Sequence, residues 1–339
     1  MTKLKQIYYG RLFIKITGVK MAKESKSIKI PTSWRVKRYY IFIAITVIAL
    51  GLPWITVDGN HFFLLSFDKL KLHLAFIQFD MQELYLMPFL LLSMFVGIFG
   101  MTVVGGRIFC GWICPQTVFR VIYRDLIETK ILGLHKRIKN KQKEPDMSKA
   151  QNKVKKVIAI LLWIVLALIA AADFLWFFVP PEDFFIYLAD FSNHWTLFGI
   201  LIGIAAFLIY DIVFLKENFC VYVCPYSRVQ SVFYDEHTIM ALYDMHRGGH
   251  IYDDNKEKQF TKQKDIQVQE PHAECTACES CVTVCPTHID IRKGLQLECI
   301  NCLECVDACT TVMGKLGRPS LVTWSSDYEI VDQNGKTQY

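Results

Sequence analysis

Two runs of four cysteines near the C-terminus carry the strongest chemical signal, and both have the spacing C-x2-C-x2-C-x3-C. The first run is Cys275, Cys278, Cys281 and Cys285, and the second is Cys299, Cys302, Cys305 and Cys309. An iron–sulfur cluster needs four thiolates that converge on a small volume, and short loops leave backbone N–H groups free to face the sulfides. The doubled spacing therefore predicts a pair of iron–sulfur clusters and a protein that transfers single electrons.

The spacing also predicts which cysteines share a cluster. In two-cluster ferredoxins the fourth cysteine of each run binds the cluster of the other run. We therefore expect Cys309 to complete the first cluster and Cys285 to complete the second. The predicted ligand sets are Cys275, Cys278, Cys281 and Cys309 for cluster 1, and Cys299, Cys302, Cys305 and Cys285 for cluster 2.

Zinc and disulfide bonds are the alternatives for so many cysteines. A structural zinc site usually has two well-separated pairs, whereas three cysteines at two-residue gaps crowd a single tetrahedral ion. Disulfides do not persist in a reducing compartment, which is where the topology below places this segment. Thr310 rather than proline follows the second run, but proline is not a ligand. The iron–sulfur interpretation is therefore favoured.

The other four cysteines form a second pair of motifs with the pattern C-x3-C-P. They are Cys110 and Cys114 before Pro115, and Cys220 and Cys224 before Pro225. On a helix, thiols at i and i+4 lie on one face, close enough to hold one metal ion together. Soft thiolates favour copper(I), zinc or a further iron–sulfur cluster, although free cysteine also packs simply as a small apolar residue. The duplication favours a functional role, and spacing leaves open whether the two pairs meet.

Composition places these motifs on a membrane protein. Of the 339 residues, 53% are hydrophobic, and they gather in four blocks. Each block has about 20 mostly apolar residues, the length that a helix needs to cross roughly 30 Å of hydrocarbon. The predicted spans are about 39–57, 84–104, 157–179 and 195–215. Each C-x3-C-P motif follows the second or fourth span, so the membrane domain reads as two hairpin repeats.

The distribution of basic residues predicts the orientation. Residues 1–38 have eleven Lys and Arg against the single acid Glu24, and residues 105–156 have thirteen Lys and Arg against four acids. Residues 180–194 have no Lys or Arg. Because basic loops stay in the cytoplasm, both termini and both cysteine regions are expected there. The net charge of +6 therefore reflects membrane topology, and it does not imply nucleic-acid binding.

We predict an α-helical integral membrane domain with four transmembrane helices, joined to an α+β ferredoxin-like domain with two clusters. The predicted division is a basic cytoplasmic N-terminus over 1–38, a membrane domain over 39–230, a polar linker over 231–271, a cluster domain over 272–322 and a C-terminal tail over 323–339.

Three stretches in combination carry a resemblance to a known family. They are Gly106–Phe119 and Cys220–Ser231, each with a C-x3-C-P motif, and the doubled cysteine runs separated by Ile289–Gln296. Over roughly residues 31–322 the chain resembles the CcoG family, also called FixG or RdxA. These are multi-pass proteins of the bacterial cytoplasmic (inner) membrane, required for assembly of cbb3-type cytochrome c oxidase. Members usually continue into a further span and an external immunoglobulin-like domain.

The resemblance implies cofactors, site residues and partners. The eight clustered cysteines would hold two 4Fe-4S clusters, and the family is implicated in reducing copper(II) to copper(I). Expected partners are membrane lipid, copper ions, a cytoplasmic electron donor, and subunits of the oxidase or copper chaperones and transporters. The residues that would act on copper are Cys110, Cys114, Cys220 and Cys224.

The predicted function is thus that of a membrane-bound iron–sulfur oxidoreductase that reduces copper(II), an electron-transfer enzyme of the cupric reductase type. Two other interpretations stay open. The membrane half also resembles the NapH group, in which a quinol-linked protein relays electrons. Alternatively, the chain is a non-enzymatic, copper-binding assembly factor for the oxidase.

Overall fold

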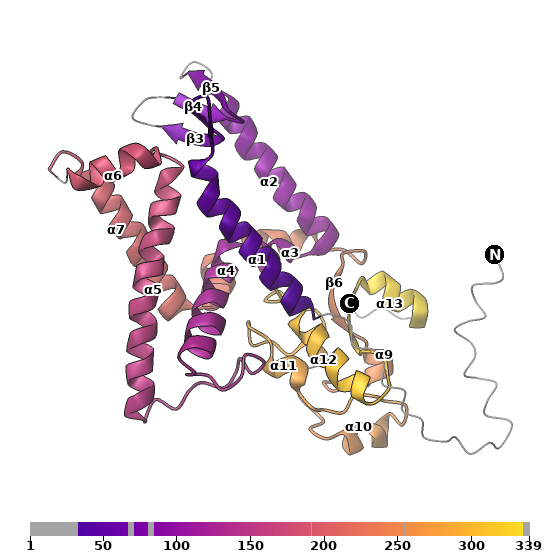
Figure 1. The fold of residues 1–339 in the computed structure, drawn as a ribbon. Coiled ribbons are helices and arrows are strands. Elements are labelled where there is room, and N and C mark those ends of the chain that lie inside the picture. The colour runs from indigo at the N-terminus through magenta and orange to yellow at the C-terminus, as the bar shows by residue number, and fades with distance from the viewer. Residues whose placement is uncertain are drawn as a thin grey trace.

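The computed structural model describes residues 33–66, 71–80, 85–190, 192–253, 255 and 257–334. Most of the predicted basic N-terminus, residues 1–32, lies outside the described residues, as does the end of the predicted tail, 335–339. Long helices occupy one part of the molecule, and the cysteine-rich C-terminal part packs at one end of them (Figure 1).

Four helical segments are long and apolar enough to cross a membrane, as the sequence predicts. They are Trp34–Trp54, which comprises α1 (Trp34–Gly51) and the 3-10 turn η1 (Leu52–Trp54); Met87–Gly105 of α2 (Leu86–Gly105); α5 (Ala150–Trp176); and Trp195–Leu215, which comprises α7 (Trp195–Tyr210) and the π-helical turn η4 (Asp211–Leu215). Two of these helices start before the predicted spans, since α1 begins at Trp34 and α5 at Ala150. The apolar blocks predict the membrane-crossing part, but a helix continues into polar sequence until a breaker ends it.

The helices α5 and α7 form the tightest pair of the membrane part. Ala159, Trp163, Ala167 and Ala171 recur every fourth residue of α5, and all four are buried. The three alanines let helices approach closely, and such close packing stabilises helix pairs in a membrane, where the hydrophobic effect does not drive association. The indole N–H of Trp163 donates to the carbonyl of Leu208 in α7 over 3.4 Å. The outer surfaces of α1 and α2 are instead largely apolar and exposed, as lipid-facing helices require.

The connections between paired helices lie together at one end of the molecule (Figure 1). Between α1 and α2 run the short hairpin of β1 (Thr56–Val57) and β2 (Asn60–His61), and the antiparallel meander β3 (Phe63–Ser66), β4 (Lys71–Leu74) and β5 (Ile77–Asp80). Leu64 and Leu72 form the buried face of this meander. The helix α6 (Pro181–Ala189) connects α5 to α7 at the same end.

The other end carries short helices that hold the C-x3-C-P motifs. After α2 come α3 (Ile108–Trp112), α4 (Pro115–Val121) and the π-helical segment η3 (Ile122–Ile131). After η4 come η5 (Phe219–Val223), α8 (Tyr226–Val229) and η6 (Gln230–Phe233). In each motif the proline follows the second cysteine at the start of the next helix. Pro115 is the first residue of α4, and Pro225 is the N-cap of α8, so neither position needs a backbone N–H for the helix.

The cysteine-rich part is built around a two-stranded antiparallel sheet of β6 (Met240–Tyr243) and β7 (Val322–Ser325). Around it lie α9 (Met245–Gly248), α10 (Gln263–Gln269), α11 (Ser280–Thr283), the turn η7 (Ile291–Lys293), α12 (Glu304–Lys315) and α13 (Asp327–Asn334). The strands lie in stretches that the sequence analysis assigns to a linker and largely to a tail. All four residues of β6 are buried, so this part of the predicted linker is core.

One hydrophobic core joins the two parts of the molecule. Trp112, which lies between the cysteines of the first C-x3-C-P motif, packs in the same cluster as Tyr243 and Leu303 of the C-terminal part. Trp34 at the start of α1 contacts Trp112 and Trp324 edge to face, with ring centroids 6.1 and 5.2 Å apart. The side chain of Ser33 and the backbone N–H groups of Trp34 and Arg35 donate to the Asp307 carboxylate of α12. The first membrane helix is therefore capped by the C-terminal part.

Candidate redox site

The eight clustered cysteines line two neighbouring cavities. Cys275, Cys278, Cys281 and Cys309 line one cavity, and Cys285, Cys299, Cys302 and Cys305 line the other. Each cavity thus contains the three near cysteines of one run and the fourth cysteine of the other run. Cys281 lines both cavities, which places the two sites next to each other. This arrangement fits the predicted crossed ligand sets, with four sulfur donors for each 4Fe-4S cluster.

The two runs also share their backbone conformation. Ala277 and Glu279 have φ of 51° and 54°, and the residues 24 positions later, Asn301 and Leu303, have φ of 51° and 61°. These left-handed residues turn successive N–H groups inward, and such concave backbone binds anions. The N–H of Ala277 donates to the sulfur of Cys275, and the N–H of Asn301 donates to that of Cys299. Both cavities therefore offer a cradle for an anionic cluster.

The cavities are poorly solvated, which disfavours free thiolates. Burial raises the pKa of Cys299 to about 12, and it raises the pKa of Cys281 despite the nearby charge of Arg292. Metal binding needs the deprotonated thiolate, so iron must displace these protons when a cluster forms.

The structure brings the four C-x3-C-P thiols together, which the spacing left open. Electrostatic interactions connect Cys220 with Cys110, Cys114 and Cys224, and they connect Cys110 with Cys224 across the two motifs. All four side chains are partly exposed. Burial raises the pKa values of Cys110 and Cys220 to about 12. Within the described ranges, no three Cys, His, Asp or Glu side chains lie close enough to hold one metal ion, and this applies to these four thiols and to the eight clustered cysteines alike.

The two motifs have the same backbone geometry at their start. Gly106 has φ 55° and ψ −130°, and Lys216, 110 positions later, has φ 54° and ψ −129°. Corresponding cysteines and prolines are separated by the same number of positions. Glycine adopts this left-handed conformation freely, whereas lysine does so only under constraint from its surroundings. The duplication seen in the sequence therefore extends to the backbone conformation of the turn that precedes each C-x3-C-P motif.

Hydrogen bonds fix the backbone around the four thiols. The amide of Gln230 donates to the sulfur of Cys110 over 3.9 Å, and the hydroxyl of Thr117 donates to the carbonyl of Cys110 over 2.5 Å. The Ser227 hydroxyl donates to the carbonyl of Cys224 over 2.8 Å, and the Arg107 guanidinium donates to the Ser227 carbonyl. The contacts of Gln230 with Cys110 and of Arg107 with Ser227 connect the first motif to the segment of the second motif.

The loop of the second cavity packs directly against the first C-x3-C-P motif. A Cβ atom added to Gly111 would lie 2.3 Å from the carbonyl oxygen of Ile300, so only glycine fits there. The indole N–H of Trp112 donates to the carbonyl of Asn301 over 3.1 Å. The Asn301 side chain donates to Gly105 over 2.8 Å and accepts from the N–H of Ala241 over 3.1 Å. The loop between Cys299 and Cys302 thus contacts both the membrane motif and the sheet.

A buried ion network lies beside this contact. Glu304, between Cys302 and Cys305, is 0% exposed and pairs with Lys141 at 2.7 Å, Arg38 at 3.0 Å and Arg35 at 3.3 Å. Burial alone would raise its pKa, but these cations outweigh burial and lower the pKa of Glu304 to about 2. The Arg38 guanidinium also donates to the carbonyls of Gly111 and Cys302.

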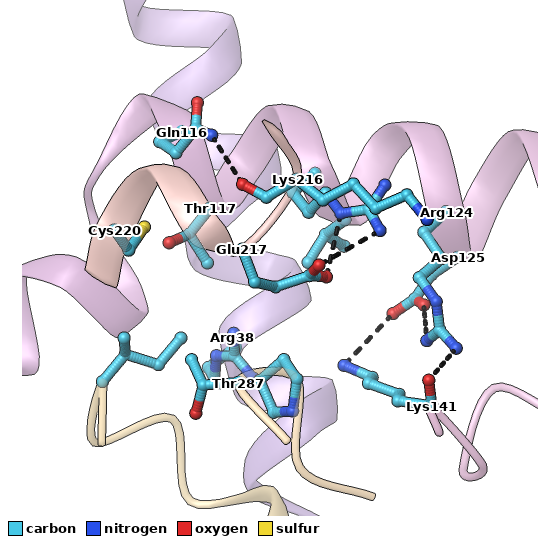
Figure 2. A pocket seen from close by; sticks show the side chains of 14 residues that line it. Arg38, Gln116, Thr117, Arg124, Asp125, Lys141, Lys216, Glu217, Cys220 and Thr287 are labelled. Carbon is cyan, nitrogen blue, oxygen red and sulfur yellow. Dashed lines mark hydrogen bonds and ion pairs between the residues drawn. The ribbon is translucent and has the colours of Figure 1, made fainter. Parts of the chain in front are cut away.

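A small chamber lined by charged side chains adjoins both the second cavity and Cys220 of the thiol group (Figure 2). Its wall includes Thr287 and Ile300 on the cavity side and Cys220 on the membrane side. Five basic residues and two acids line it, namely Arg38, Arg120, Arg124, Lys141, Lys216, Asp125 and Glu217. The chamber has about 40 Å³, which is room for one or a few water molecules.

Sequence reasoning missed the residues that join the two parts. A glycine between two cysteines, where the second motif has Val221, and an acid between Cys302 and Cys305 were visible signals. Their meaning depends on contacts with residues more than 100 positions away, which no local pattern reveals.

Two protein-family models match the chain. A "4Fe-4S dicluster domain" matches residues 215–327, and a "4Fe-4S binding domain" matches residues 87–135. The first range contains both cysteine runs, and it also contains the second C-x3-C-P motif. The second range contains the first C-x3-C-P motif. The chain is therefore an iron–sulfur protein with two 4Fe-4S clusters.

Three curated proteins are similar over most of the chain. RdxA of Cereibacter sphaeroides is 27% identical over 303 residues, which is 86% of this chain and 60% of RdxA. The nitrogen fixation protein FixG of Rhizobium meliloti is 29% identical over 84% of this chain and 55% of FixG. RdxB of C. sphaeroides is 29% identical over 79% of this chain and 55% of RdxB.

The chain therefore spans between 55 and 60% of the length of these relatives. No solved structure is significantly similar to it. With four apolar helices of membrane-crossing length, two cysteine runs and two C-x3-C-P motifs, the chain is similar over most of its length to the FixG/RdxA family of iron–sulfur proteins.

Proposed function

We propose that this protein reduces copper(II) to copper(I) at the four C-x3-C-P thiols, and that it does so for the assembly of a cbb3-type cytochrome c oxidase. The observation that carries the proposal is the direct contact between the second cluster cavity and the first thiol motif at Gly111 and Ile300. A redox centre and a group of soft ligands thus lie against each other. The oxidase is proposed from the family resemblance.

The thiol group suits copper as a substrate. Each copper(II) ion takes up one electron to become copper(I), and no other bond needs to change. Thiolates are soft ligands that bind copper(I) in preference to harder ions, so they favour the reduced product. The 4Fe-4S clusters, when bound, supply single-electron transfer. The partial exposure of Cys110, Cys114, Cys220 and Cys224 leaves them open to an incoming ion.

The proposed orientation follows from the basic segments. With both basic stretches in the cytoplasm, the four spans return the chain to the same side, and both cysteine regions face the cytoplasm. The electron donor, the copper chaperones or transporters and the oxidase subunits are proposed partners on this basis. The protein is proposed to lie in the bacterial inner membrane.

A double substitution tests the role of the thiols. In Cys114→Ser with Cys224→Ser, we expect the cluster absorbance to persist and copper(I) formation to fall to background. Copper(I) is measured with a chromogenic chelator after anaerobic reduction of the protein. Ser231→Ala is the matched control and should behave as wild type, because in the described part of the chain the Ser231 hydroxyl donates to the exposed Arg228 carbonyl and not to a cysteine. Copper reduction that continues in the double variant would refute the proposal.

A further cluster at the four thiols is the second candidate, because the 4Fe-4S binding domain matches the range with Cys110 and Cys114. Iron analysis separates the two. Two clusters of four predict about eight iron atoms per chain, and a third would bring about twelve. If the double variant above loses about a third of its iron, the thiols hold a cluster rather than copper.

A further inference from the structure

A groove rich in basic and hydroxyl side chains lies on the C-terminal part of the molecule, apart from the thiol group. Its walls come from the start of α1, the connection between η3 and α5, and the helices α11 and α12, which lie near one another in Figure 1. It has a volume of about 460 Å³. None of the twelve cysteines, which all fall within the described ranges, lines this basic groove. It is therefore separate from the cluster cavities and from the thiols.

A single layer of side chains separates the basic groove from the first cluster cavity. Ser280 and Val312 line both the groove and that cavity. Ala308 and Thr310, the two sequence neighbours of Cys309, also line the groove, and Cys309 itself lines the cavity. A molecule bound in the groove would therefore lie next to the ligands of the first cluster.

The first cluster cavity is also the more accessible of the two. Cys278 is the exposed member of the eight clustered cysteines, all of which the structure describes. In the second cavity Cys299 and Cys302 are buried, and the loop between them packs at Ile300 against Gly111 of the first C-x3-C-P motif. An electron from a soluble donor therefore enters at the first cluster, and the second cluster is the one in contact with the thiol motif.

The basic groove has cations without anionic partners. Arg137 and Lys139 of the connection before α5, and Lys315 at the end of α12, line it and are exposed. In the part of the chain that the structure describes, no acidic side chain forms an ion pair with these three residues. The acid in the described groove wall, Asp307, already accepts hydrogen bonds from the start of α1. The groove thus offers its positive charge to a molecule from outside.

We infer that the basic groove docks a small acidic protein that carries single electrons, and that this protein reduces the first cluster. One electron passes from the reduced carrier to the bound cluster, so the carrier is oxidised by one electron, and no bond forms or breaks. Surfaces of opposite charge speed the encounter of two such partners and fix their orientation. The inference names the kind of electron donor for the proposed function and rests on that function in this respect.

A pyridine nucleotide is the competing anionic occupant. It donates two electrons together as a hydride, whereas each 4Fe-4S cluster accepts one electron at a time. The three cations also come from two separate elements, the connection before α5 and the last turn of α12. Such a spread of charge fits a broad acidic surface. A one-electron carrier protein therefore suits both the chemistry and the shape of the charge.

Binding is tested with oxidised flavodoxin, an acidic one-electron carrier, and the full chain in phosphatidylcholine nanodiscs, with surface plasmon resonance as the readout. At low salt we expect Arg137→Glu, Lys139→Glu and Lys315→Glu together to weaken binding about tenfold or more. The matched control variant reverses three exposed lysines that do not line the groove, namely Lys149, Lys262 and Lys264.

The binding data overturn the inference in three cases. The first is no binding of flavodoxin to the wild type, and the second is equal weakening in both triple variants, which would reflect net charge alone. The third is binding that does not weaken as salt rises, because exposed charges are screened within about 10 Å at 0.1 M salt. Equal cluster absorbance in all three proteins shows that the substitutions leave the fold intact.

Electron transfer is tested with reduced flavodoxin and copper-free protein. Electron paramagnetic resonance of samples frozen at successive times follows the reduced clusters. We expect reduction to be about tenfold slower or more in the groove variant than in the control variant. NADH alone should leave the clusters oxidised, and reduction by NADH at the rate of flavodoxin would overturn the inference in favour of the nucleotide.

The same samples separate this inference from the copper proposal. If flavodoxin reduces the clusters through the basic groove but copper(II) does not reoxidise them, the groove stands and the copper proposal fails. If dithionite-reduced protein reduces copper(II) but flavodoxin reacts equally with both triple variants, the groove fails alone.

Discussion

The two groups of cysteines in this chain are held in different ways. Of the eight cysteines of the C-terminal part, five lie in loops, and Cys281, Cys305 and Cys309 lie on α11 and α12. Left-handed residues in the loops turn backbone N–H groups toward the sulfurs of Cys275 and Cys299. The four C-x3-C-P thiols lie at helix ends, where the left-handed residue comes four positions before the first cysteine. The first group lines two cavities in sets of four, whereas the second brings together two pairs of partly exposed thiols from two separate motifs.

The largest difference between the groups is expected when one cysteine of each is removed. Cys302→Ser should lose the second cluster and about half of the iron, because a cavity ligand cannot be replaced from solvent. Cys114→Ser should keep the iron content of wild type. Iron and acid-labile sulfide analysis of anaerobically purified protein provides the measurement. Equal iron loss in both variants would show that both groups of cysteines bind iron.

The ion network beside the second cavity should have the next largest effect. Glu304→Gln leaves Arg38 and Lys141 buried without their anion, and we expect unfolding free energy to fall by about 3–5 kcal/mol at neutral pH. Because the pKa of Glu304 is lowered to about 2 in the folded protein, its stabilisation is complete above the unfolded pKa of 4.5 and is lost as pH falls toward 2.

Denaturant unfolding at pH 7 and at pH 4 checks this expectation. The difference between wild type and Glu304→Gln should narrow at the lower pH. Glu236→Gln is the control, since Glu236 is 59% exposed on its side chain and contacts only His237 among the ion pairs of the described chain. A difference that is independent of pH would rule out the charge of Glu304 as the cause.

One added methyl group should destabilise the contact between the first C-x3-C-P motif and the loop of the second cavity. In Gly111→Ala the new Cβ meets the backbone of Ile300, so the loop of the second cavity must shift, at a cost of about 1–3 kcal/mol. Gly203→Ala, with no atom within 4 Å of the added carbon, should stabilise its helix slightly. Thermal unfolding in detergent compares them. Similar melting temperatures for both variants would mean that the two regions are not in tight contact.

The smallest effect is expected at the start of the second motif. Lys216→Gly relieves a left-handed backbone and should raise stability by up to about 1 kcal/mol. The ion pair of Lys216 with the exposed Glu144 contributes little. A higher melting temperature is the expected result, with Lys216→Ala as the control that keeps the strain. A gain of equal size in Lys216→Ala would show that the side chain, and not the backbone, is responsible.

The sequence predicts those features that depend on local pattern. Apolar blocks of span length predict the four long helices, and the cysteine spacing predicts two 4Fe-4S clusters. The strand β6 (Met240–Tyr243) lies within the predicted polar linker, and its partner β7 lies about 80 positions further along the chain, so no local pattern predicts their pairing. The pairing of Arg38 with Glu304 spans 266 positions and has no local signature. The contact between Tyr39 and Asp125 forms where α1 packs against η3. The spacing of residues within each helix does not predict this packing.

The capping of α1 by Asp307 has a consequence for synthesis. The ribosome makes Trp34 and Arg35 more than 270 positions before the carboxylate that accepts their N–H groups. During translation the start of the first helix therefore lacks these acceptors until Asp307 has been made. A product that stops before α12 lacks both Asp307 and Glu304, so the N–H groups of Trp34 and Arg35 and the cations of Arg35 and Arg38 lose these partners.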